Sequence, residues 1–364
     1  MKYICLKCSK YEAITTKKAN CDCGGLWKLD WKPKKFDLDL IDKDIWGIFR
    51  YRNFMPLIDD SWKSISLGEG MTPIIRFNED VLLKMDYLMP TLSFKDRGAA
   101  VLISHCKSIG VNKVLQDSSG NAGNSVAAYS AKANIECEIF VPKGTSDKKI
   151  NMIRSHGAKV NIIRGVRDYC ADVCRLEVKN SKAYYASHVY NPFFYEGTKT
   201  YIYEVYEQLK RIPSNIFIPL GNGTLFIGVI KGLEELLNSN IIDKMPNIIA
   251  VQSEYCAPFF KTVSTKNKNL VKVDIKPTMA EGIAIGKPMR ANEILDYIYK
   301  YDVKVVISKE DRIIEARNNL AKKGIYVEHT TAATYAAYLT YCDVNGKISD
   351  TLIPMCGAGL KSDH

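Results

Sequence analysis

The chain has 364 residues, of which 46% are hydrophobic and 25% charged, the composition of an ordinary soluble globular protein. This length predicts two domains and leaves room for a small appendage. The formal net charge is +11, but no basic block alternates with aromatic residues, so we expect no nucleic-acid partner. No run of about 18 apolar residues occurs and residues 1–30 contain no apolar core, so we expect no membrane span, no signal peptide and a cytoplasmic location.

The N-terminal segment is rich in cysteine. Four of the eleven cysteines form a CxxC pair and a CxC pair separated by twelve residues: Cys5, Cys8, Cys21 and Cys23. Four thiolates at this spacing are typical of a closed tetrahedral zinc site, which is structural and not catalytic. We predict a zinc-knuckle or zinc-ribbon arm over residues 1–32, and the alternative is a cysteine-rich arm without metal. The other seven cysteines are expected to be small buried hydrophobic residues.

After the arm in the sequence, residues 31–60 are predicted to form a linker. Further along, strands alternate with helices, which indicates a parallel, doubly wound sheet and an α/β fold of two lobes. The predicted strands cover residues 72–75, 81–84, 113–117, 137–142, 159–163, 215–220, 247–252, 325–327 and 351–355. The predicted helices cover residues 98–106, 124–133, 147–155, 198–210, 225–237, 311–322 and 331–341.

Lys95 stands immediately before an alanine-rich run that is expected to be helical. A lysine that opens a helix lies at the positive end of the helix dipole, which disfavours its charged form. A lysine held neutral is a nucleophile and can form a Schiff base. In an arbitrary sequence such a lysine is usually a solvated partner of a neighbouring acid, here Asp96. Two glycine-rich loops later in the chain favour the role of Lys95 as a nucleophile that forms a Schiff base.

Both loops follow a predicted strand and precede a predicted helix. The first is Ser-Ser-Gly-Asn-Ala-Gly-Asn at residues 118–124, and the second is Gly-Asn-Gly-Thr-Leu at residues 221–225. Backbone amides and the helix dipole can make the second loop an anion site, although alone it could equally be a plain turn. It matches neither the Walker pattern nor GxGxxG, so nucleotide binding is disfavoured.

Together with residues 67–73 and 356–361, these segments resemble the fold type II pyridoxal-phosphate enzymes of the tryptophan synthase β superfamily, and most closely the threonine synthases. The resemblance implies that Lys95 forms the Schiff base with the cofactor and that Asn121 hydrogen-bonds its ring hydroxyl. It also implies that Cys356 is the partner of the pyridine nitrogen. The implied cofactor-phosphate site consists of Gly221, Asn222, Gly223, Thr224 and Leu225.

The same resemblance predicts how the substrate binds. Its carboxylate is assigned to the first loop, at Ser118, Ser119, Gly120, Asn121 and Ala122. Ser119 matches the serine that dehydratases and racemases of this fold use opposite the lysine, whereas threonine synthases more often have threonine. In residues 191–200 we would expect an arginine that binds a substrate phosphate, and the matching residue is Phe194. Leu92 also replaces the glycine usual in the lysine motif. His188 could act as an acid or base nearby, although a lone histidine is more often packed.

These departures favour a lyase that carries out β-elimination or β-replacement on a small amino acid, with Lys95 also removing the α proton. The alternatives are threonine synthase acting on O-phosphohomoserine and a non-catalytic binding or regulatory homologue. The resemblance further implies a homodimer, a large cofactor-binding domain of residues 33–112 and 191–364, and a small domain of residues 113–190.

Overall fold

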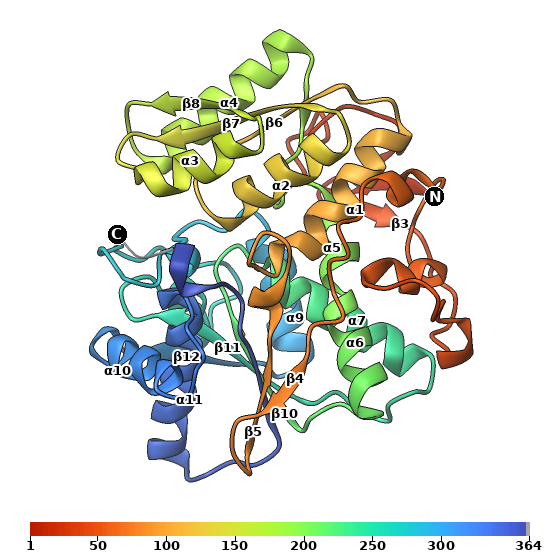
Figure 1. Cartoon of the computed structure of the whole chain (residues 1–364). Helices are drawn as coiled ribbons and strands as arrows, with labels where there is room; N and C mark the ends of the chain where they lie inside the picture. Colours follow the sequence, from red (N-terminus) through yellow and green to blue (C-terminus); the bar gives the residue numbers. More distant parts are fainter. Residues whose placement is uncertain (362–364) are drawn as a thin grey trace. The chain divides into compact units, whose positions relative to one another are not determined.

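The computed structural model describes residues 1–361, which divide into two compact units. The first unit contains Met1–Gly70 and Lys95–Thr200, and the second contains Met71–Phe94 and residues 201–361 (Figure 1). The chain enters the first unit for the second time at Lys95 itself. This division differs from the predicted domain boundaries, which grouped residues 33–112 with 191–364, and those domains stay a prediction.

The N-terminal arm of the first unit is a three-stranded antiparallel sheet. Its strands are ordered β2-β1-β3, with bounds β1 (Lys2–Cys5), β2 (Tyr11–Glu12) and β3 (Trp27–Asp30). Tyr3 and Cys5 of β1, and Trp27 and Leu29 of β3, are buried, whereas the residues between them are more exposed. This period of two gives the small sheet one buried face.

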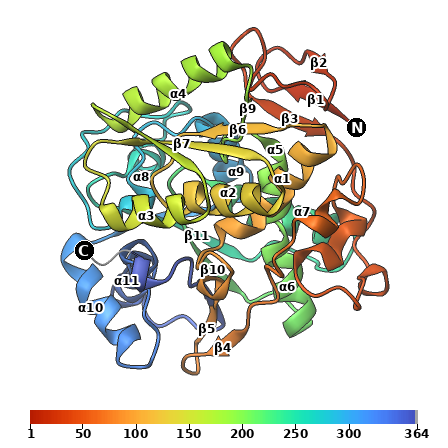
Figure 2. The same cartoon turned by 45° about the horizontal axis from the view of Figure 1, so that its top comes forward.

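A parallel sheet with the order β8-β7-β6-β9 forms the rest of the core of the first unit. Its strands are β6 (Lys113–Gln116), β7 (Glu136–Pro142), β8 (Lys159–Ile163) and β9 (Tyr184–Tyr185). The helices are α1 (Lys95–Ser108), α2 (Asn121–Lys132), α3 (Asp147–Ser155), α4 (Arg167–Ser181) and α5 (Pro192–Thr198). Helices α2 and α3 cover one face of the sheet and α4 covers the other (Figures 1 and 2). Three 3₁₀ helices precede them: η1 (Leu38–Leu40), η2 (Ile48–Phe54) and η3 (Ser61–Ser64).

The second unit is built on a six-stranded sheet with the order β12-β11-β10-β13-β5-β4, parallel except at β4. Its strands are β4 (Ile74–Arg76), β5 (Val81–Lys84), β10 (Asn215–Pro219), β11 (Asn247–Ser253), β12 (Lys304–Ser308) and β13 (Thr351–Pro354). Helices α10 and α11 lie on one side of it and α6 and α7 on the other (Figures 1 and 2). The helices of this part are η4 (Asp86–Leu88), α6 (Thr200–Leu209), α7 (Thr224–Asn238), α8 (Pro258–Ser264), η5 (Glu281–Ile283), α9 (Ala291–Lys300), α10 (Glu310–Ala321), α11 (His329–Asn345) and η6 (Gly359–Lys361).

The predicted α/β architecture with parallel sheets is confirmed, and one predicted strand needs correction. The helix expected at 198–210 is α6, and the prediction missed the short helix α5 directly before it, which starts at Pro192, where Asn191 accepts a hydrogen bond from the Phe193 N–H. The strand expected at 325–327 forms only an isolated bridge, between Val327 and Ala358. The prediction also missed α4, α8, α9, β9 and β12. No helix in residues 1–361 is both long and apolar enough to cross a membrane.

Candidate active site

Lys95 is the first residue of α1, as the sequence predicted. The residues before it are held within the second unit, where the Phe94 N–H donates to the Cys356 carbonyl at 2.9 Å and Ser93 bridges to Gly357. In the first unit, the Nζ of Lys95 lies 5.7 Å from the centroid of the Phe194 ring. Lys95 therefore starts its helix directly after an anchored segment, which limits the freedom of its backbone.

Phe194 is completely buried, with an exposed fraction of 0%. Its ring packs so closely against Gly98 that a methyl group on that glycine would overlap it. The ring also meets the imidazole of His188 edge to face, with centroids 5.8 Å apart. His188 in turn pairs with Gln116, whose Nε2 lies 3.2 Å from the His188 Nδ1. Lys95, Gln116, His188 and Phe194 form what we call the lysine cluster.

The first glycine-rich loop connects β6 to α2. Asn121 is the first residue of α2, and Ser118, Ser119 and Gly120 form the turn before it. A side chain at Gly123 would overlap the carbonyl oxygen of Ser118, so the loop can fold back on the helix only with glycine there. The sequence thus places this loop at the carboxyl end of a parallel strand, where α/β proteins usually bind ligands.

Two buried hydrogen bonds tie α2 to its surroundings in the first unit. Ser125 donates to Asp96, the second residue of α1, at 2.6 Å, and the Tyr129 hydroxyl donates to Glu69 at 2.9 Å. Burial raises the pKa of Glu69 to about 7, against the lowering effect of the Leu67 N–H and the Tyr129 hydroxyl. The Ser125–Asp96 bond holds α2 against α1, and the Tyr129–Glu69 bond holds α2 against the segment that contains Glu69. The sequence did not predict these two bonds, because the partners of each lie far apart in the chain.

The second glycine-rich loop, in the second unit, connects β10 to α7. Gly223 has a φ of +77° and forms the N-cap of α7, which therefore has no side chain at its cap. A side chain at Gly221 would come within 3.0 Å of the backbone of Gly282 and Ile283. Glycine is thus needed at both positions, and the uncapped start of a fifteen-residue helix suits an anionic phosphate.

Cys356 is buried in the second unit, directly after β13. Next to it, a side chain at Gly357 would overlap the carboxylate of Glu328, and the Gly357 N–H donates to the Thr331 hydroxyl at 3.1 Å. The Glu328 N–H donates back to the Gly357 carbonyl at 3.0 Å. Sequence reasoning missed Glu328 and Thr331, and the signal that could have found them is the tight Cys-Gly-Ala-Gly turn, which needs a partner at its glycine.

The predicted cofactor and substrate residues are thus distributed over both units. Lys95, the loop 118–122 and Phe194 lie in the first unit, whereas residues 221–225 and Cys356 lie in the second. The structure brings Lys95 and Phe194 together, and it connects Cys356 to the residue before Lys95. The roles assigned to these residues stay predictions.

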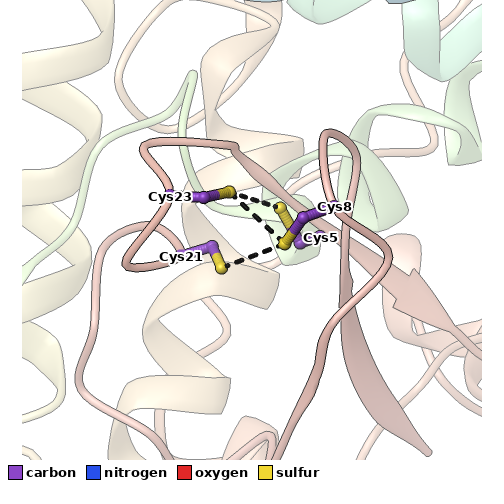
Figure 3. Close-up of side chains that lie close together, drawn as sticks. All are labelled: Cys5, Cys8, Cys21 and Cys23. Atoms are coloured by element: carbon purple, nitrogen blue, oxygen red, sulfur yellow. Dashed lines mark hydrogen bonds between the residues drawn. The ribbon is translucent and has the colours of Figure 1, made fainter.

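The four N-terminal cysteines converge in the first unit and form what we call the cysteine cluster (Figure 3). Their sulfur atoms all lie within 4.8 Å of one another, at 3.4 to 3.6 Å for the hydrogen-bonded pairs. All four are free thiols. A side chain at Gly25 would overlap the Cys5 sulfur, so the turn after the CxC pair requires glycine. Four sulfurs about 2.3 Å from one tetrahedral ion would lie about 3.8 Å apart, so this arrangement fits zinc.

The arm packs on the helices that carry the lysine cluster. The Tyr3 hydroxyl lies 3.2 Å from the His105 Nε2 on α1, and the Tyr3 ring meets Phe193 of α5 edge to face. His105 stacks on Phe193 at 3.7 Å, and burial lowers the pKa of His105 to about 3. The histidine is therefore neutral and part of an aromatic contact between the arm and both helices.

Comparison with known proteins identifies the family. Residues 65–357 match the family described as pyridoxal-phosphate dependent enzyme. The chain belongs to this family. It is 32% identical to the threonine synthase of Methanocaldococcus jannaschii over 91% of this chain and 85% of that protein. It is 29% identical to the threonine synthase of Mycobacterium tuberculosis strain H37Rv over 86% of this chain and 88% of that protein.

Solved structures agree on the fold. Threonine deaminase isoform 2 from Solanum lycopersicum superimposes with a TM-score of 0.70 at 21% identity, covering 90% of this chain and 92% of that one. A fungal L-serine ammonia-lyase from Rhizomucor miehei superimposes with a TM-score of 0.69 at 22% identity, covering 79% of this chain and 93% of that one. The predicted recognition as a threonine synthase-like, pyridoxal-phosphate-dependent lyase of fold type II is thereby confirmed. Neither comparison decides which amino acid is converted.

Proposed function

We propose that this enzyme performs β-elimination or β-replacement on a small amino acid with an uncharged side chain. The observation that carries the proposal is that the segment 191–200 contains one cation, and that this cation is already paired with a carboxylate. The cation, Lys199, is buried and paired with Glu196 at 2.6 Å, and its Nζ lies over the Trp31 ring. A phosphate dianion requires a charge-assisted partner. Neither Phe194 nor the paired lysine supplies one.

The residues have the following proposed roles. When bound, pyridoxal phosphate withdraws electrons from the α carbon of an amino acid and thereby permits loss of the α proton and of a β substituent. The Nζ of Lys95 would hold the cofactor and would accept the α proton. Residues 221–225 bind the cofactor phosphate, and Asn121 and Cys356 bind its ring. The loop from Ser118 to Ala122 would bind the substrate carboxylate, and Ser119 would act on the substrate from the side opposite Lys95.

Threonine synthase activity is the second candidate. It is favoured by the names of the curated relatives, such as the two that align with 91% and 86% of this chain. That reaction uses O-phosphohomoserine, and the segment 191–200 would then need a cation from another part of the chain. The structural relatives point to deaminase and ammonia-lyase chemistry, but at 21 and 22% identity their likeness supports only the fold.

We further propose that the cysteine cluster binds one structural Zn²⁺. Four sulfur ligands leave no open position for a substrate, so the metal would stabilise the arm and take no part in the reaction. The backbone supports this proposal, because the Lys7 N–H donates to the Cys5 sulfur at 3.3 Å.

The proposed reaction can be tested with the cofactor-loaded enzyme and five substrates: L-serine, L-threonine, O-acetyl-L-serine, O-phospho-L-serine and O-phospho-L-homoserine. Formation of 2-oxo acid and release of phosphate are measured for each. We expect the largest kcat/KM for a substrate without a phosphate group. Efficient formation of threonine from O-phospho-L-homoserine would contradict the proposal and establish the second candidate.

A further inference from the structure

His188 is held in place on two sides within the lysine cluster. Its Nδ1 is 3.2 Å from the Nε2 of Gln116, and its ring lies edge to face with that of Phe194. Only 7% of His188 and 1% of Gln116 are exposed. The two residues are 72 positions apart, so the pair forms only in the folded unit. A histidine fixed this way presents its remaining nitrogen, Nε2, in one direction.

Both residues keep one polar atom without a protein partner. Within residues 1–361, the Nε2 of His188 forms no hydrogen bond, and the Oε1 of Gln116 is buried without a partner. Buried polar atoms are nearly always hydrogen-bonded. The buried, unpaired oxygen of Gln116 therefore indicates that a ligand group completes this pair, and the Nε2 of His188 is available to bind the same ligand. The neighbouring Lys95 identifies the ligand as the amino acid that the enzyme converts.

The imidazole carries no charge. Burial, and then the positive charges of Lys95 and Arg167, hold the pKa of His188 well below its usual value. With Nδ1 accepting from Gln116, the ring proton lies on Nε2. This nitrogen can hydrogen-bond a neutral oxygen, but it adds no charge to balance a phosphate dianion. Arg167 is exposed, and it is the cation besides Lys95 whose charge acts on His188.

We propose that His188 is a specificity-determining residue whose Nε2 hydrogen-bonds the hydroxyl group of a serine- or threonine-type substrate. This inference rests on the proposed function and names its substrate class. A hydroxyl oxygen accepts the hydrogen bond of the Nε2–H without bringing a charge into the site. A site built to hydrogen-bond a substrate hydroxyl discriminates strongly against analogues that lack it.

The test compares two amino acids that have no α proton and so bind without reacting. They are α-methyl-L-serine and 2-aminoisobutyrate, which differ only in the hydroxyl group. Their dissociation constants are measured from the absorbance of the cofactor-loaded wild type, His188→Leu and His188→Gln. We expect the wild type to bind α-methyl-L-serine about tenfold more tightly than 2-aminoisobutyrate. The preference should disappear in His188→Leu and persist in His188→Gln, which keeps a hydrogen-bonding side chain.

Turnover provides the second readout. In His188→Leu, kcat/KM for L-serine should fall about tenfold or more, whereas that for 3-chloro-L-alanine, which has no hydroxyl, should stay within about threefold. Equal losses for both substrates, or an unchanged binding preference in His188→Leu, would overturn the role of His188 and leave the proposed function intact. A wild-type preference for O-phospho-L-serine that Arg167→Ala removes would also overturn it. A hydroxyl preference in binding without turnover of any β-substituted amino acid would overturn the proposed function instead.

Discussion

The cysteine cluster and the lysine cluster are built in opposite ways, although both lie in the first unit. The four cysteines come from 19 consecutive residues and converge through local turns and a small sheet. The lysine cluster takes Lys95, Gln116, His188 and Phe194 from two helices, a strand end and the segment after β9. The first cluster can form whenever the arm folds, whereas the second requires the whole unit. We therefore expect the cysteine cluster to govern local stability and the lysine cluster to govern chemistry.

The largest effect is expected at Lys95. Lys95→Ala should lower activity by roughly 10⁴-fold or more, because both the covalent link and the proton transfer depend on Nζ. The absorbance band of the covalently bound cofactor should disappear, while the unfolding midpoint of the cofactor-free protein should stay near that of the wild type. Lys132→Ala, on the exposed face of α2, is the matched control. Retention of the band in Lys95→Ala would show that another lysine holds the cofactor.

Substitutions in the cysteine cluster should lower the stability of the arm rather than act on the reaction directly. Protein prepared without chelators should contain one zinc per chain by elemental analysis, and Cys8→Ser or Cys23→Ser should lose it. We expect a loss of arm stability on the order of 5 kcal/mol, because binding of a structural metal is coupled to folding. Proteolysis within residues 1–32 reports that loss. Cys342→Ser, outside the cluster and half-buried, should keep the metal. Metal-free wild type with a protease-resistant arm would contradict the prediction.

Glu69 makes the free energy of unfolding depend on pH. Its pKa is raised from 4.5 to about 7 in the folded state, so the folded protein binds a proton more tightly than the unfolded chain. This contribution is complete below about pH 4.5 and is lost as the pH rises through 7, a change of up to about 3 kcal/mol. Glu69→Gln should flatten the pH dependence of the unfolding free energy between pH 5 and 8. Equal slopes in wild type and variant, measured by denaturant unfolding, would exclude a neutral buried Glu69.

The smallest expected effect is the change in stability when Leu92 is replaced. It has a φ of +62° at the position where similar enzymes usually have glycine. A side chain costs roughly 1 kcal/mol in this left-handed conformation. Leu92→Gly should therefore unfold at higher denaturant concentration than Leu92→Ala, which keeps the strain and removes the same side chain beyond Cβ. If the alanine variant is as stable as the glycine variant, the backbone at this position does not require the left-handed conformation.

The features that the sequence predicted are those in which the informative residues are close together in the chain. The cysteine spacing, the helix that starts at Lys95 and the two strand-loop-helix glycine segments are of this kind. The sequence could not predict the Gln116–His188 pair or the Glu328–Gly357 contact, because each joins residues that the folded units alone bring together. It also could not show that Lys199 is already paired, and this pairing is what removes a cation from the segment 191–200.

The most direct test of the central claim is a competition experiment. The cofactor-loaded enzyme is given L-serine and O-phospho-L-homoserine at equal concentration, and the products are quantified by mass spectrometry over the first turnovers. The account predicts that pyruvate, or a replacement product if a nucleophile is supplied, forms faster than threonine. Threonine as the dominant product would contradict it, and the substrate phosphate would then be bound by a cation outside the segment 191–200.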